Sequence, residues 1–248
     1  MNPLLTVKVE EQARETLSRN LDELRSRINA ACARSGRDPR SIKLVLSTKY
    51  VDTSVIRLLY QLGITEMGEN RVQDTQRKQE ALADLPIRWH MFGHLQRNKV
   101  KKALRLFELI HSVESPALAE EINEASLRMG KRANILVEIN ISGEPQKYGL
   151  KAEDTIPFLE KISPMKGLRI LGLMTMTPLM GIDNVDVDTD LCRGIFRGLR
   201  QLSEEIGKRG IENIKMEYLS MGMTQDFEIA IEEGANLLRI GSAVFKGI

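Results

Sequence analysis

The sequence predicts a closed (β/α)₈ barrel with an additional helix before its first strand. Two observations predict this α/β fold. Eight short apolar segments alternate with amphipathic helical segments, and a length of 248 residues suits one such barrel. A doubly wound open sheet is the alternative, but no G-x-G-x-x-G follows the first strand, which argues against its dinucleotide-binding form. We therefore expect residues 1–248 to form a single barrel domain.

The first element is a helix that precedes the barrel. Apolar residues recur at spacings of three and four from Leu17 to Ala31, with charged residues between them. Gly36 and Pro39 are expected to end this helix. Its apolar face has to pack either on the barrel or on a second subunit, and the sequence leaves that choice open.

Strand and helix candidates then alternate to the end of the sequence. The strand candidates are residues 42–48, 64–70, 87–93, 107–113, 134–141, 169–176, 215–222 and 236–242. The helix candidates are residues 55–63, 98–106, 115–130, 153–163, 194–210 and 226–234, several of which end at a glycine, as helix C-caps do. One long loop, residues 177–191, follows the sixth strand.

Composition favours a globular cytoplasmic protein that acts on a small molecule. Hydrophobic residues make up 42% and charged residues 28% of the sequence, and a net charge of +2 does not indicate a nucleic-acid or membrane partner. The two cysteines have no metal-binding spacing and fit a reducing compartment. No apolar run reaches the roughly eighteen residues of a membrane span, and the charged N-terminus does not resemble a signal peptide.

Lys49 is the first candidate functional residue. It follows the apolar strand "IKLVLST", and lysines are rarely buried unless they are paired. Such a lysine usually marks the return of the chain to water. In a barrel, however, the carboxyl ends of the strands form the functional face. There the amine can be partly desolvated and attack a carbonyl group.

The last two strands end in glycine-rich turns that resemble a phosphate site. Gly222 and Gly241 let the main chain approach a ligand closely, and Ser220 and Ser242 add hydroxyl groups. Loops after the seventh and eighth strands of such barrels often bind phosphate through backbone N–H groups. The alternative is that these are ordinary strand-end turns.

Arg239 lies two residues before the final turn, in an otherwise apolar strand. It must either pair with an acid, such as Glu138 or Glu217, or point into the barrel mouth. A lysine, a phosphate site and an arginine between them describe a site for pyridoxal 5′-phosphate (PLP). Lys49 would form the Schiff base with the aldehyde, and Arg239 would hydrogen-bond the pyridine nitrogen. Because arginine donates a hydrogen bond without giving up its proton, the ring would be a weak electron sink.

At these residues the sequence resembles the pyridoxal phosphate homeostasis protein family, which is similar to the N-terminal barrel domain of alanine racemase. The matching segments are "LSTK", "MGENRVQD", "RWHMFGHLQRNKVK", "INISGEPQKYGL", "LGLMTM" and "LSMGMTQDFEIAIEEGANLLRIGSAVF". The resemblance implies that Lys49 carries PLP and that Arg239 faces the ring nitrogen.

The same resemblance implies that Ser220, Gly222, Gly241 and Ser242 hold the phosphate. It also implies that Asn70 and His90 line the pocket. Three departures from the family pattern stand out. Asp52 replaces a proline that usually follows the lysine, Thr224 replaces a serine, and Ala235 and Asn236 replace small hydroxyl residues. None of them removes a predicted ligand group.

We expect a PLP carrier that serves cellular PLP homeostasis, rather than an efficient enzyme. The chain ends at Ile248, directly after the eighth strand and its turn, so we expect no further domain to supply an opposing acid or base. A PLP-dependent amino-acid racemase of low activity is the alternative. PLP-dependent apo-enzymes are candidate partners, and we expect a monomer or weak homodimer.

Three other functions are weaker interpretations. Glu138 and Glu217 as paired carboxylates suggest a glycoside hydrolase, but aromatic residues make up only 4% of the sequence. His90 and His94 do not share a helix face, so no metal site is expected. The basic run "RNKVKKALR" is better explained as the solvated face of a barrel helix than as a nucleic-acid site.

Overall fold

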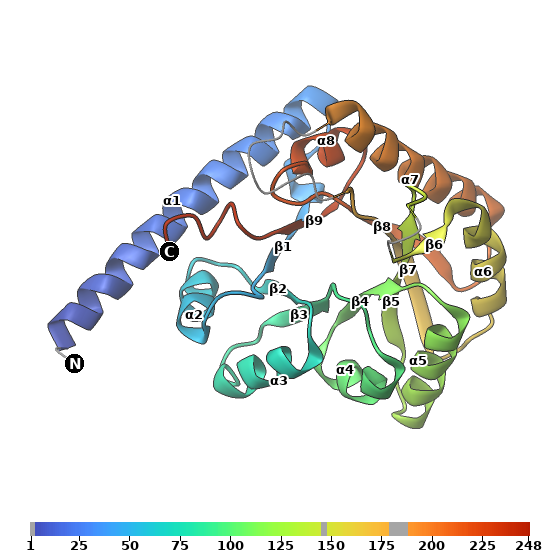
Figure 1. Cartoon of the computed structure of the whole chain (residues 1–248), viewed down its shortest axis with the longest axis horizontal. Helices are drawn as coiled ribbons and strands as arrows, with labels where there is room; N and C mark the ends of the chain where they lie inside the picture. Colours follow the sequence, from blue (N-terminus) through green and yellow to red (C-terminus); the bar gives the residue numbers. More distant parts are fainter. Residues whose placement is uncertain (1–2, 145–147, 179–187) are drawn as a thin grey trace.

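Eight parallel strands form a closed ring. The computed structural model describes residues 3–144, 148–178 and 188–248. Around the ring the strands follow the order β1-β2-β3-β4-β5-β7-β8-β9, and β9 pairs with β1 to close it (Figure 1). The strands are β1 Lys43–Ser47, β2 Glu66–Glu69, β3 Arg88–Met91, β4 Leu109–Val113, β5 Ala133–Asn140, β7 Leu168–Met174, β8 Ile214–Ser220 and β9 Leu237–Ile240. The predicted barrel is therefore confirmed.

Helices surround the ring of strands and follow each strand in turn (Figure 1). They are α1 Pro3–Ser35, α2 Thr53–Gln61, α3 Val72–Ala81, α4 Val100–Leu106, α5 Pro116–Arg128, α6 Thr155–Ile162, α7 Thr189–Arg209 and α8 Phe227–Glu232. Short 3₁₀ turns lie at Pro39–Ser41, Arg97–Lys99 and Ala152–Asp154. A two-residue strand, β6 Leu150–Lys151, pairs in parallel with the end of β5.

Two differences from the predicted elements have a physical reason. Helix α3 was not predicted because it is hydrophilic, and only Val72 and Thr75 of its residues are buried. Helix α7 begins at Thr189, earlier than expected, where Asp188 caps it by accepting a hydrogen bond from the Leu191 N–H at 2.9 Å. Most of the loop predicted over residues 177–191 lies outside the described residues.

The first helix packs on the barrel. Leu17, Leu21 and Leu24 of α1 are buried, and α1 contacts α8 and α2. Asn20 fixes the end of the chain against α1, because its side-chain amide donates to the backbone oxygens of Val244 and Lys246, both at 2.9 Å. The apolar face of α1 therefore packs on the barrel, which is one of the two partners that the sequence left open.

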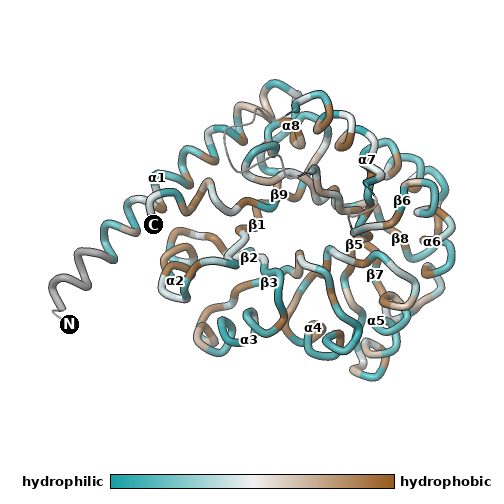
Figure 2. The backbone as a smooth tube through the Cα atoms, viewed as in Figure 1, coloured by the Kyte–Doolittle hydropathy of each residue, from teal (hydrophilic) through white to brown (hydrophobic). Residues whose placement is uncertain are grey.

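Apolar side chains form two separate clusters. The larger lies between the strands and the helices, and the smaller lies inside the ring of strands. The inner cluster consists of Val45, Phe92, Leu109, Leu136, Leu171, Met174 and Leu237. Figure 2 shows apolar stretches along several of the strands and mixed colours along the outer helices. Inside the ring, Phe92 occupies the space left by Gly68, where a Cβ atom would lie 2.0 Å from Cε2 of the Phe92 ring.

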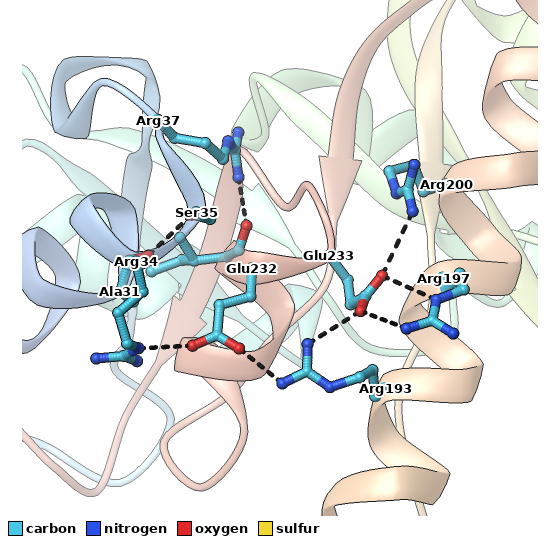
Figure 3. Close-up of polar contacts among 10 residues, drawn as sticks. Ala31, Arg34, Ser35, Arg37, Arg193, Arg197, Arg200, Glu232 and Glu233 are labelled. Carbon is cyan, nitrogen blue, oxygen red and sulfur yellow. Dashed lines mark hydrogen bonds and ion pairs between the residues drawn. The ribbon is translucent and has the colours of Figure 1, made fainter.

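An ion-pair cluster holds α8 between α1 and α7 (Figure 3). Glu232 accepts hydrogen bonds from Arg34 of α1 at 2.8 Å and from Arg193 of α7 at 2.6 Å. Glu233 is contacted by three arginines of α7, namely Arg193, Arg197 and Arg200. The cluster therefore fixes α8, which connects the two turns where phosphate binding is predicted.

Gly68 should be intolerant of a side chain. We expect Gly68→Ala to lower the free energy of unfolding by about 2 kcal/mol, because the added methyl group must displace the Phe92 ring. Urea unfolding followed by circular dichroism measures this change. Gly194→Ala is the matched control, since a Cβ there meets nothing within 4 Å and alanine favours the helix. Equal stability of the two variants would contradict this packing.

Candidate functional site

Lys49 lies at the carboxyl end of β1, beside the turn that follows β9. Leu46 of β1 is in register with Ile240 of β9, so Lys49 lies close to Gly241 along the same rim. The lysine is exposed, and its ammonium lies 4.7 Å from the centre of the Tyr50 ring. The expected partial desolvation is not observed. Thr48, the preceding residue, is buried and donates to Glu69 at 2.6 Å, which fixes the backbone at this point.

Arg239 points into the barrel and has no carboxylate partner among the described residues. It is 5% exposed and donates to the Ser220 hydroxyl at 2.7 Å and to the Thr175 carbonyl at 2.9 Å. Neither of the acids proposed as partners pairs with it. Burial lowers the pKa of Arg239 to about 10, so the guanidinium stays charged at neutral pH. Thr175 could not be identified from the sequence, because it contributes a backbone carbonyl, which every residue carries.

The turn after β9 presents two backbone N–H groups to Thr224, which follows β8. The N–H groups of Gly241 and Ala243 both lie 3.4 Å from the Thr224 hydroxyl oxygen. Within the described residues, the N–H groups of Gly222 and Ser242 have no hydrogen-bond acceptor. Converging N–H groups of this kind are typical of phosphate sites. The residues present therefore fit a phosphate group at these turns.

The Ser220 hydroxyl forms hydrogen bonds with two side chains inside the barrel. Its oxygen contacts Nδ1 of His111 at 2.9 Å and accepts from Arg239. We expected this hydroxyl to donate to phosphate, but Ser220 is fully buried between these two side chains. It anchors the arginine instead.

The structure separates Asn70 and His90. Asn70 follows β2 and is exposed on the same rim as Lys49. His90 is buried, and both of its ring nitrogens are occupied, one by Glu66 at 2.7 Å and the other by His111 at 2.9 Å. It therefore lies inside the barrel between Glu66 and His111, and its role in lining the pocket stays a prediction.

A second ionisable group lies close to Arg239. Glu138 of β5 is 3% exposed and shares a strand face with Leu136 of the inner cluster. Its carboxyl group forms no hydrogen bond with any described residue. Burial and the negative charge of Glu114 raise the pKa of Glu138 to about 7, against the opposing effect of Arg239. Glu138 therefore changes its charge near neutral pH.

The weaker interpretations lose support from this geometry. Glu217 is exposed while Glu138 is buried, so the two carboxylates do not form one site. The described residues contain no group of three or more histidine, cysteine, aspartate or glutamate side chains that could hold a metal ion. No helix in the described ranges is long and apolar enough to cross a membrane.

A barrel with these groups at the carboxyl ends of its strands belongs to a known class. The family model for the alanine racemase N-terminal domain matches residues 16–248. A pyridoxal phosphate homeostasis protein of Aquifex aeolicus is 40% identical over 231 residues, which cover 93% of this chain and 96% of that protein. One of Pseudomonas aeruginosa is 32% identical over 230 residues, with 93% and 95% covered. The chain therefore belongs to the pyridoxal phosphate homeostasis protein family, within the alanine racemase N-terminal domain class.

Solved structures agree with this assignment. PipY of Synechococcus elongatus with PLP bound is 31% identical, with a TM-score of 0.80 and coverage of 92% of this chain and 99% of that one. An alanine racemase of Clostridium difficile has a TM-score of 0.74 at 15% identity, and the match covers 93% of this chain and 56% of the racemase. The racemase shows the shared fold.

Glu138 should make stability depend on pH. Because its pKa is raised in the folded state, its contribution to stability is complete below about pH 4.5 and is lost as the pH rises through about 7. We expect the change in the free energy of unfolding caused by Glu138→Gln to be about 2 kcal/mol more stabilising at pH 8 than at pH 5.

Urea unfolding of the cofactor-free protein at the two pH values measures this difference. Glu217→Gln, which changes an exposed carboxylate, is the control and should show no such dependence. An identical effect of Glu138→Gln at pH 5 and pH 8 would show that Glu138 is ionised at both.

Proposed function

We propose that this protein binds PLP as a Schiff base on Lys49 and acts as a carrier that maintains the supply of free cofactor. Three groups on neighbouring strands support this proposal. The Lys49 amine would hold the aldehyde, Arg239 would donate to the pyridine nitrogen, and the N–H groups after β8 and β9 would hold the phosphate. The PLP-bound relative and the names of the curated relatives support the same ligand.

The state of Arg239 is the observation that favours a carrier. PLP supplies an electrophilic aldehyde and an aromatic ring that can accept electrons. Its electron-accepting power is greatest when the ring nitrogen is protonated. Arg239 stays charged and donates without releasing its proton, so it would leave that nitrogen unprotonated. Such a site holds the cofactor while giving little help to carbanion chemistry. PLP-dependent apo-enzymes stay the candidate recipients.

Replacement of Lys49 tests the proposed attachment. We expect Lys49→Ala to lose the visible absorption of a Schiff base after mixing with PLP, because the nearby Lys78 amine is already bound to the Glu69 carboxylate at 2.7 Å. Borohydride reduction followed by peptide mass spectrometry should place the adduct on Lys49 in the natural protein. Lys166→Ala is the control, since that exposed lysine precedes β7 at the opposite end of the barrel. A reducible adduct retained in Lys49→Ala would refute the assignment.

Hydrogen exchange in amino acids tests the carrier role against the racemase alternative. We expect the PLP-loaded protein to exchange the Cα hydrogen of L-alanine or L-serine with D₂O little faster than free PLP does. Proton NMR of the amino acid measures the rate. Rapid exchange or racemisation would favour the enzyme, and an unrelated lysine-rich protein loaded with PLP provides the baseline.

A further inference from the structure

Four side chains below the mouth connect Arg239 to the opposite end of the barrel. His90 contacts Glu66 at 2.7 Å and His111 at 2.9 Å, each through a different ring nitrogen. His111 contacts the Ser220 hydroxyl at 2.9 Å, and Ser220 accepts from Arg239 at 2.7 Å. We refer to Glu66, His90, His111, Ser220 and Arg239 as the polar row. It runs from the first residue of β2, through β3, β4 and β8, to β9.

The polar row is shielded from water. His90, His111 and Ser220 are at most 1% exposed. Phe92 packs edge-on against His111 with ring centres 4.9 Å apart, and its ring centre lies 6.0 Å from Cζ of Arg239. In such a dry environment each hydrogen bond is strong, and each unsatisfied polar atom is costly. The proton positions along the row are therefore well determined.

The carboxylate at one end sets the direction of the bonds. Burial raises the pKa of Glu66, but the hydrogen bond from His90 and the positive charges of His90, Lys43 and Arg88 outweigh it, so the net pKa lies below the ordinary value. An ionised carboxylate only accepts, so Nε2 of His90 must carry a proton. When this is the only proton on the His90 ring, Nδ1 of His90 accepts from Nε2 of His111, 2.9 Å away.

The same logic continues to Arg239. Burial is the main cause that lowers the pKa of His111 well below its ordinary value, followed by the positive charges of His90, Arg239 and Lys43. A neutral His111 that donates from Nε2 has a lone pair at Nδ1, so it accepts the hydroxyl proton of Ser220. The Ser220 oxygen is then free to accept from Arg239. Each hydrogen bond in the row is then donated in the direction from Arg239 toward Glu66, and each of these donors has an acceptor.

An additional proton would reverse part of the row. A cationic His90 would donate from both nitrogens, and His111 would then donate from Nδ1 to Ser220. The Ser220 oxygen would receive two donors, and its own proton would have no further acceptor among the described residues. The arrangement in which every hydrogen bond is donated toward Glu66 is therefore the one that gives each polar hydrogen of the row an acceptor.

We propose that Glu66, His90 and His111 are positioning residues that fix the Ser220 hydroxyl and thereby aim the Arg239 guanidinium at the barrel mouth. The Thr175 carbonyl fixes the second guanidinium nitrogen at 2.9 Å, which would leave the remaining N–H groups available to a ligand. The ligand that they meet rests on the proposed function, whereas the arrangement of the row does not.

Imidazole NMR of the cofactor-free protein tests the arrangement directly. The sequence has three histidines, and His94→Gln removes the signals of the one outside the row. In ¹⁵N spectra at neutral pH we expect His90 and His111 to be neutral and protonated at Nε2 alone. A proton at Nδ1 of either ring, or a cationic ring, would overturn the proposal. This experiment needs no cofactor and no variant within the row, so its result is independent of PLP binding.

Glu66→Gln tests whether the row positions Arg239. An amide at residue 66 can donate to His90 as well as accept, so both tautomers should become populated. We expect the Arg239 guanidinium N–H signals to exchange with water roughly tenfold faster, and PLP to be released roughly tenfold faster, as for the loss of one charged hydrogen bond.

Glu69→Gln is the matched control. It also removes a buried charge from β2, but Glu69 contacts Thr48 and Lys78 and lies outside the row. Glu69→Gln should lower stability without changing the histidine tautomers or the Arg239 exchange. Equal Arg239 exchange in the two variants would reduce Glu66 to a structural role and overturn the proposal. If the expected tautomers and Arg239 exchange are observed but PLP does not bind, the row stands and the proposed ligand fails.

Discussion

The structure of this site depends on a guanidinium that is enclosed in a barrel and that pairs with no carboxylate of the described residues. A buried charge is costly, and the usual remedy is an ion pair. Arg239 is stabilised instead by a hydroxyl and a backbone carbonyl, while Asp226 and Glu138 act on it only through their charges at a distance. Neutral acceptors satisfy its hydrogen bonds but leave its charge uncompensated. Under the proposed function, an acceptor presented by the ligand at the barrel mouth would complete the hydrogen bonding of this residue.

Neutral acceptors of this kind have to be held in place. A hydroxyl group rotates freely unless its own proton is engaged, and a serine that donates in the wrong direction would oppose Arg239. His111 removes this freedom by accepting the Ser220 proton. His90 and Glu66 in turn select the tautomer of His111, so the orientation of one hydroxyl is determined by a carboxylate three contacts away. Lys43 and Arg88 keep that carboxylate ionised.

Much of the fold, and the ends of the site, could be predicted from the sequence. Strand periodicity located β1 and β9, and it placed Lys49 and Arg239 near the rim because parallel strands end on one face. The polar row could not be predicted, because its contacts join residues 24, 21 and 109 positions apart. Alternation within a strand tells which face a residue occupies, but the stagger between neighbouring strands decides its height in the barrel. The register aligns Glu66 with Arg88, so the Glu66 carboxylate meets His90, the third residue of β3, only because the two side chains reach across two residue positions.

The polar row also joins two ends of the barrel that usually have separate roles. In this fold the carboxyl ends of the strands carry the functional groups and the amino ends mainly contribute stability. Glu66, together with Lys43 and Arg88, belongs to the amino end, yet its charge fixes a hydrogen-bond direction that reaches the mouth. A substitution there would change the site without touching any ligand. The apolar inner cluster makes this possible, because Phe92 excludes the water that would otherwise interrupt the row.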